Sequence, residues 1–230
     1  YWTDDGWLRL TRGGNQPADY YEVPINEPDQ SAATNEFVDD FSEAKLNDEH
    51  WNTLRKMPTS DWLSFKDGLI PRGGQSPQSE FDQHLVAKRQ KDVNFSTGVE
   101  VESAPSTYMQ LAGIGLYLDI DNYLFLMISQ DEKLGKVITI LQASKGEFSI
   151  LNPLTSIDTK KVYLEISVQG LDAQLSYRNS DGQLISLKKG VDISFLSGGF
   201  TGNFVALDSI DMGQYNRSAA KFTNFNYKPL

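Results

Sequence analysis

The chain has 230 residues, of which 39% are hydrophobic and 11% aromatic, so it has enough apolar side chains for a packed core. Its formal net charge of −10 excludes the basic surface needed to bind nucleic acid or an anionic membrane, and is compatible with a neutral ligand such as a carbohydrate. The chain has no cysteine, which excludes disulfides, cysteine nucleophiles and thiolate metal sites and leaves two locations open, the cytoplasm and the bacterial periplasm or exterior.

Residues 1–36 differ from the rest of the chain. Residues 25–36 are polar and without periodicity, as is typical of a linker, and Asp4-Asp5-Gly6 marks a turn. The chain begins without Met, without an apolar leader and without a membrane-length apolar run, so we expect residues 1–36 to be the remnant of a preceding domain plus a linker. Aromatic residues are dense here and either pack on a neighbouring domain or form a stacking platform for sugars: Tyr1, Trp2, Trp7, Tyr20 and Tyr21.

Short apolar runs separated by turn signals fill residues 37–230. Residues 47–53 read as one helical turn that directs Trp51 inward. The runs at 110–118 and 123–128 predict a hairpin buried on both faces. In the last run, Phe222 and Phe225 break strict alternation, which indicates a bulge.

About a dozen such strands, at the spacing usual for sandwiches, together predict an all-β fold. We expect an antiparallel two-sheet β-sandwich over residues 37–230.

Nothing in the sequence singles out a catalytic constellation. His50 and His84 are the only histidines, neither has the spacing of a metal ligand, and we expect both to be structural. No G-x-S-x-G nucleophile motif is present, and no carboxylate pair stands out for glycoside hydrolysis. The basic residues Lys88, Arg89 and Lys91 are expected to form salt bridges on an acidic surface.

Acidic residues near strand ends offer a weak calcium signal. Asp39 and Asp40 precede a strand, and Asp208 and Asp211 are expected to follow one. Acidic loops that meet at a sheet end could hold Ca²⁺, which takes six to eight oxygen ligands. The alternative is that these carboxylates lie in solvated turns, and no other cofactor is indicated.

The stretch from Ser197 to Asp211 has the most specific pattern. Gly198 and Gly199 give the backbone conformational freedom directly before Phe200, and an apolar run that reads as a buried strand begins at Phe204. A large aromatic residue is thereby placed at the tip of a glycine-rich loop. Such a ring either caps a core or is presented to another surface.

Five segments resemble, in this order, one known domain. They are DDFSEAKLNDEHWNTLR, IPRGGQSPQSEFDQHLVAKRQ, VYLEISVQGLDAQLSY, GGFTGNFVALDSIDM and KFTNFNY. The domain is the C-terminal β-sandwich of family 43 glycoside hydrolases, the β-xylosidases and α-L-arabinofuranosidases. The resemblance covers about residues 37–230, and YWTDDGWLRLTRGGNQP resembles the last strands of that family's catalytic propeller.

The resemblance implies a concanavalin A-like jelly roll and a catalytic propeller upstream, whose acids act with inversion. No catalytic residue is then expected in this chain. In the family a loop of the sandwich reaches over the propeller, and a phenylalanine on it helps to close the substrate pocket. That position matches Phe200, so Phe200, Gly199 and Thr201 are the expected substrate contacts. Asn203 and residues 214–217 depart from the family's shorter loops, which bears on specificity.

The sequence and the resemblance leave three alternative hypotheses for the function of the chain. In the first, the chain is the accessory domain of a glycoside hydrolase that acts on xylan- or arabinoxylan-type oligosaccharides and is inactive alone. In the second, it is a free-standing, lectin-like carbohydrate-binding module. In the third, it is a structural sandwich that stabilises its neighbour or a homo-oligomer. Neither nucleic acid nor a membrane is expected as a partner.

Overall fold

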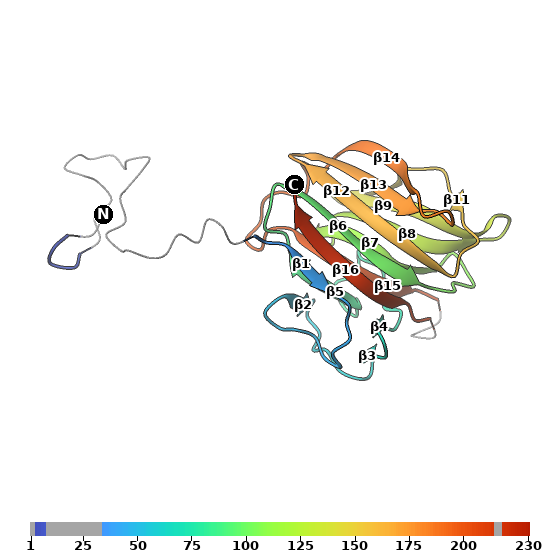
Figure 1. Ribbon diagram of the computed structural model, residues 1–230, viewed down its shortest axis with the longest axis horizontal. Helices are drawn as coiled ribbons and strands as arrows, with labels where there is room; N and C mark the ends of the chain where they lie inside the picture. The colour runs from blue at the N-terminus through green and yellow to red at the C-terminus, as the bar shows by residue number, and fades with distance from the viewer. Residues whose placement is uncertain (1–2, 8–33, 214–217) are drawn as a thin grey trace. The chain divides into compact units, whose positions relative to one another are not determined.

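The computed structural model describes residues 3–7, 34–213 and 218–230 (Figure 1). The chain divides into two compact units, Tyr1–Thr34 and Asn35–Leu230. In the first unit the expected turn at Asp4-Asp5-Gly6 is present, closed by a hydrogen bond of 2.8 Å from the Thr3 amide to the Trp7 carbonyl. Trp7 is exposed, and four of the aromatic residues expected to cluster lie outside the described residues: Tyr1, Trp2, Tyr20 and Tyr21.

The second unit contains two antiparallel sheets. The first sheet has the order β14-β13-β12-β6-β16-β4-β3, with β1 paired to β16. Figure 1 shows β12, β6 and β16 side by side in this layer. Its strands are β1 (Phe37–Asp39), β3 (Leu63–Phe65), β4 (Leu69–Pro71), β6 (Asn94–Glu102), β12 (Lys161–Gln169), β13 (Asp172–Arg178), β14 (Leu184–Asp192) and β16 (Lys221–Pro229).

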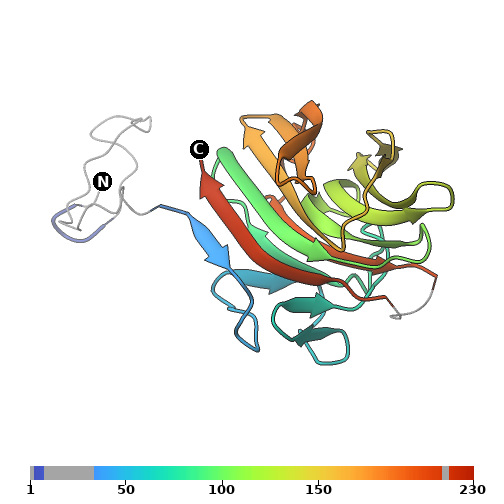
Figure 2. The same cartoon turned by 45° about the vertical axis from the view of Figure 1, so that its right-hand side comes forward.

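The second sheet lies behind the first, as the turned view in Figure 2 shows. Its order is β10-β9-β8-β7-β15-β5-β2, with β11 paired to β9. Its strands are β2 (Trp51–Thr53), β5 (Leu85–Arg89), β7 (Gln110–Asp119), β8 (Asn122–Asp131), β9 (Gly135–Ser144), β10 (Glu147–Ile150), β11 (Thr155–Ser156) and β15 (Phe204–Asp211). The predicted all-β, concanavalin A-like sandwich is confirmed.

The main core lies between the sheets. Side chains alternate along a strand, so every second residue of β12 points inward, and Leu164 and Ile166 are fully buried there. Leu124 and Leu126 of β8 belong to the same core from the second sheet. The expected irregularity of the last strand is present, because Asn224 at φ +53° forms a bulge. The bulge lets both Phe222 and Phe225 point inward.

The outer face of the β7–β8 hairpin is also buried, as the hairpin prediction required. Tyr123, Phe125 and Met127 of β8 form a second apolar cluster there with residues of β5, β7 and β15. A side chain at Gly115 would meet the Phe125 ring at 2.2 Å, so the glycine is required for this packing.

Two details of the sequence analysis are corrected. Residues 47–50 form a single turn, with the Trp51 amide bonded to the Asn47 carbonyl, and Trp51 itself is the first residue of β2. Trp51 is buried, as expected. β15 continues through Asp211, so Asp208 lies inside this strand and not after it.

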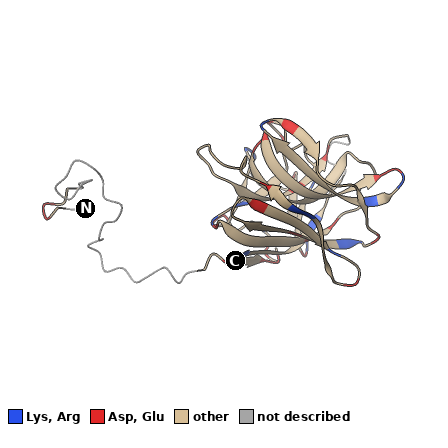
Figure 3. Ribbon diagram, turned by 90° about the horizontal axis from the view of Figure 1, so that it is seen from above, with Lys and Arg blue, Asp and Glu red and all other residues tan. Residues whose placement is uncertain are grey.

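The described residues contain no helix, and hence none long and apolar enough to cross a membrane. Figure 3, in which the ribbon is coloured by residue type, shows Lys and Arg positions interspersed with Asp and Glu positions.

Candidate functional site: the Phe200 loop

The Phe200 loop, residues 197–203, joins the core to the start of β15. Its tip is built on three glycines with positive φ: Gly198 at +105°, Gly199 at +66° and Gly202 at +69°. Residues with a Cβ rarely adopt such angles, so the sequence fixes this path with glycine. The ring of Phe200 is fully exposed to solvent at the tip. The ring therefore does not cap a core, the first of the two alternatives.

The stem before the tip is packed and hydrogen-bonded. Ile193 and Leu196 are buried in the main core, and the Leu196 amide donates to the Ile193 carbonyl at 2.9 Å. The Ser197 hydroxyl donates to the Ser194 carbonyl at 2.6 Å. The Ser194 amide in turn donates to the Asp192 carboxylate, and this bond lowers the pKa of Asp192. The loop is therefore fixed at its base while its tip stands free.

The stem after the tip is bound to the end of β5. The Arg89 guanidinium donates to the Thr201 carbonyl and stacks on Phe204, with its central carbon 4.7 Å from the ring centroid. The Gln90 amide donates to the Asn203 carbonyl at 3.1 Å, and the Asn203 side chain donates back to Gln90 at 2.6 Å. Backbone and side-chain contacts thus hold Thr201 and Asn203 in one arrangement.

The salt bridges expected for this basic segment are wrong for two of its residues. Arg89 makes the loop contacts above, and Lys88 is buried between the sheets with its ammonium 4.5 Å from the centroid of the Phe37 ring. Within the described part of the chain neither forms an ion pair. Burial lowers the pKa of Lys88, and the aromatic face partly offsets its lost hydration.

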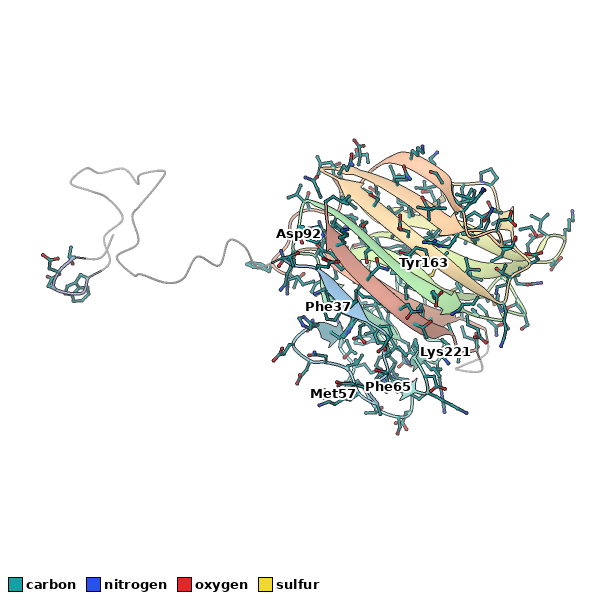
Figure 4. The ribbon with its side chains drawn as sticks, in the orientation of Figure 1. Phe37, Met57, Phe65, Asp92, Tyr163 and Lys221 are labelled. Atoms are coloured by element: carbon teal, nitrogen blue, oxygen red, sulfur yellow. The ribbon has the colours of Figure 1, made fainter. Side chains whose placement is uncertain are left out.

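Asp92 extends this anchor to the segment that enters the sandwich. Its carboxylate accepts hydrogen bonds from the Tyr227 hydroxyl and from the Asn35 side chain amide, both at 2.9 Å. Burial raises the pKa of Tyr227 to about 12, so its hydroxyl stays a donor. Figure 4 shows Asp92 at the end of the sandwich where β16 finishes. Residues 89–92 therefore hold the Phe200 loop and the entering segment at the same end.

Exposed apolar side chains gather at this end. Val93 follows the anchor directly, and Leu171 and Leu230 lie on segments whose backbones are bonded to Asn94. We call Val93, Leu171, Phe200 and Leu230 the apolar end surface. Large apolar side chains that remain in water together are typical of a surface that docks on another one.

The calcium candidates do not form one site. Asp39 uses one carboxylate oxygen for the Phe41 amide and the other for the Trp51 indole, and Asp40 accepts from the Ser42 amide, which lowers its pKa. Asp208 belongs to the other sheet, is fully buried, and has no hydrogen-bond partner on either oxygen. Burial raises its pKa to about 7. Among the described residues no three metal-ligating side chains lie together.

Both histidines have structural contacts. The His84 ring stacks on Trp62 at 4.9 Å, and its nitrogens lie 2.7 Å from the Arg72 carbonyl and 2.8 Å from the Lys56 ammonium. Burial, together with the charge of Lys56, lowers the pKa of His84. The ring of His50 packs on Phe37, with 4.3 Å between ring centroids.

Arg89, Gln90 and Asp92 are the site residues that sequence reasoning missed. Their partners lie more than a hundred residues away, or at the far N-terminal edge of the unit. The sequence places Arg89 and Gln90 at the end of an apolar strand. That position indicates where their side chains lie but not which residues they contact.

Two antiparallel sheets packed face to face around one main core define a concanavalin A-like β-sandwich. The chain belongs to the family of β-xylosidase C-terminal concanavalin A-like domains, whose family model matches residues 38–228. The resemblance to the C-terminal sandwich of family 43 glycoside hydrolases is thereby confirmed.

Curated relatives agree with this assignment. The chain is 28% identical to a β-xylosidase from Bacillus subtilis and 25% identical to a xylan 1,3-β-xylosidase from a Vibrio species. Each alignment covers 99% of this chain but only 44% and 43% of the respective relative. The chain thus spans less than half the length of these relatives.

Solved structures give the same result. The chain superposes on a xylan β-1,4-xylosidase from Bacillus halodurans with a TM-score of 0.83 and 27% identity, over 99% of this chain and 45% of that one. A family 43 protein from Bacillus licheniformis matches with a TM-score of 0.82 at 23% identity, which shows the shared fold.

Proposed function

We propose that the chain is the accessory C-terminal domain of a glycoside hydrolase that acts on xylan- or arabinoxylan-type oligosaccharides. In this proposal the Phe200 loop helps to close the active site of a preceding catalytic propeller, and the chain has no activity alone. The observation on which the proposal rests is the exposed Phe200 ring on a stem that is fixed on both sides. The relatives named above are xylosidases about twice as long as this chain, which supports it.

The ring acts by excluding water and by limiting the shape of the substrate. A phenyl ring at the mouth of a pocket contacts a short sugar chain and obstructs a long one, and it removes water from the reacting bond. Gly199 and Thr201 flank the ring and contact the same substrate. The position of the ring matters to within about an ångström, which accounts for the bonds that Arg89 and Gln90 make to the loop.

The remaining apolar end surface packs against the propeller. Val93, Leu171 and Leu230 would lose their contact with water there, at a gain of roughly 1.5–3 kcal/mol for each side chain that is fully covered. Asn35, near the start of the sandwich unit, is bonded to Asp92 at this same end. A homo-oligomer built on the same sandwich is compatible with this arrangement.

The test is Phe200→Ala in the full-length enzyme. We expect kcat/KM on an aryl xyloside and on xylobiose to fall by about 10–100-fold, the range that one apolar pocket contact supplies. Phe81→Ala is the matched control, because Phe81 is also an exposed loop phenylalanine but lies outside the apolar end surface. Unchanged kcat/KM in Phe200→Ala would refute the proposal.

The free-standing binding module is separated from this proposal by titration. The isolated chain is titrated with xylo- and arabino-oligosaccharides in a calorimeter. Saturable heat would favour a module with its own sugar site, and no heat would favour the accessory role.

A further inference from the structure

A pocket of about 390 Å³ lies on the outer face of the second sheet, apart from the Phe200 loop. Its floor crosses β7, β8, β9 and β15, and its rim is formed by β10 and by residues 76–78. The volume is within the range of about 300–1,000 Å³ that is usual for small-molecule sites. Neither the family assignment nor the proposed function uses this pocket.

The walls of the pocket are mostly carbon. Aliphatic side chains from four strands line it: Leu111, Val137, Leu141 and Ile210 among them. Aromatic rings stand on three separate segments, with Tyr108 and Phe148 exposed by 65% and 52% and Tyr123 buried. A molecule with an apolar ring would remove these side chains from water.

The charge of the pocket disfavours an anionic ligand. Asp131 is the only charged residue that lines it. The amides of Lys133 and Leu134 donate to this carboxylate and lower its pKa, so Asp131 is an anion at neutral pH. No lysine or arginine lines the pocket to balance it. An anionic ligand is therefore repelled.

One polar group in the pocket has no partner. Thr139 lies on the same face of β9 as Val137 and Leu141 and is 3% exposed, and its hydroxyl makes no hydrogen bond. An unpaired buried hydroxyl is costly, and a ligand that offers a donor or acceptor would relieve the cost. Two other buried residues that carry a hydroxyl line the pocket, Ser129 and Tyr123. Ser129 already donates to the Tyr108 and Gln110 carbonyls, and the Tyr123 hydroxyl is carried on an aromatic ring.

These features fit one class of ligand better than another. A pyranose has a hydroxyl on most of its carbons, and a pocket whose walls are mostly carbon would leave several of them unpaired. A phenol has one hydroxyl and an apolar ring. We propose that this pocket binds a neutral phenolic group, whose ring packs among Tyr108, Tyr123 and Phe148 and whose hydroxyl pairs with Thr139.

The experiment uses the four methionines of the chain as reporters. The chain is labelled with ¹³C at the methionine methyl groups and titrated with 4-methylphenol. Met212 lines the pocket, and its methyl resonance is expected to shift saturably as the ligand is added. The methyl resonance of Met57, which lies in a different groove, should not shift. Benzoate and xylobiose are expected to cause no saturable shift of Met212. An aryl xyloside tests whether the phenolic ring is also accepted when it is joined to a sugar.

Thr139→Val is the decisive variant, because it keeps the shape of the side chain and removes only the hydroxyl. We expect it to lower the affinity for 4-methylphenol about fivefold. Its thermal midpoint should not fall, since the hydroxyl that is removed has no partner. Binding of 1,4-dimethylbenzene, which can neither donate nor accept a hydrogen bond, should be equal in both proteins. Tyr108→Ala should weaken the binding of both ligands. Val38→Ala, on the other sheet, should change the binding of neither.

Three results would overturn the proposal. They are no saturable shift of Met212 with 4-methylphenol, binding of xylobiose at least as tight as that of the phenol, and equal phenol affinity in Thr139→Val and the parent. The Phe200 proposal is measured by turnover in the full-length enzyme, so either idea can fail without the other.

Discussion

The guanidinium of Arg89 donates a hydrogen bond to the carbonyl oxygen of Thr201, the residue directly after the exposed Phe200. This bond joins the end of β5 to a loop more than a hundred residues further along the chain. Since Gln90 and Asp92 continue the same anchor to Asn203 and Asn35, one short segment sets the loop relative to the point where the chain enters the sandwich.

Arg89→Met tests the anchor. Methionine keeps an apolar stem over Phe204 but cannot donate to Thr201, so the loop tip should sample more positions. We expect kcat/KM of the full-length enzyme to fall about threefold to tenfold, less than in Phe200→Ala, because the ring is present but less well positioned. The thermal midpoint should change little, since Arg89 is exposed. A fall in the thermal midpoint without a change in kcat/KM would mean that the bond is structural only.

Gly199→Ala tests the backbone of the tip. Gly199 has φ of +66°, and a Cβ placed there would meet no atom within 4 Å, so the cost of alanine is one of conformation alone, about 1 kcal/mol. Gly135→Ala is the matched control, because Gly135 has φ of +76°, equally open surroundings and a place in the β8–β9 turn. Urea denaturation should show similar losses in both variants. Only Gly199→Ala should lower kcat/KM.

The fold could be predicted from the sequence because its signals are local. Alternation in β12, the apolar runs of β7 and β8 and the broken alternation around Phe222 each depend on neighbouring residues. The glycines around Phe200 were equally readable, since a positive φ is a property of the residue itself.

The rest of the site depends on contacts between distant residues, for which a single sequence has no local signal. The basic run around Arg89 predicts a salt-bridging surface residue, and its actual partner, a backbone carbonyl, has no residue type that the sequence could indicate. Asp208 was placed after the strand because an aspartate usually ends an apolar run. Asp208 is buried because Tyr117 and Tyr123 of the neighbouring strands lie close to it, which only the assembled structure shows.

Asp208→Asn tests the buried carboxyl through the pH dependence of stability. Burial raises its pKa in the folded state to about 7 from the ordinary value of 3.8, so between these two pH values the folded state holds a proton that the unfolded state has lost. Stability from this group is therefore full below about pH 4 and is lost as the pH rises to about 7, by roughly 4 kcal/mol at about 1.4 kcal/mol per pH unit.

The measurement is the free energy of unfolding in urea at pH 4 to 8. We expect Asp208→Asn to match the parent near pH 4 and to exceed it increasingly up to pH 7, because asparagine has no charge to bury. Asp192→Asn is the control, since Asp192 is exposed and its pKa is lowered, so its replacement should slightly reduce stability at neutral pH. Parallel pH profiles for the parent and Asp208→Asn would show that Asp208 ionises normally in the folded protein.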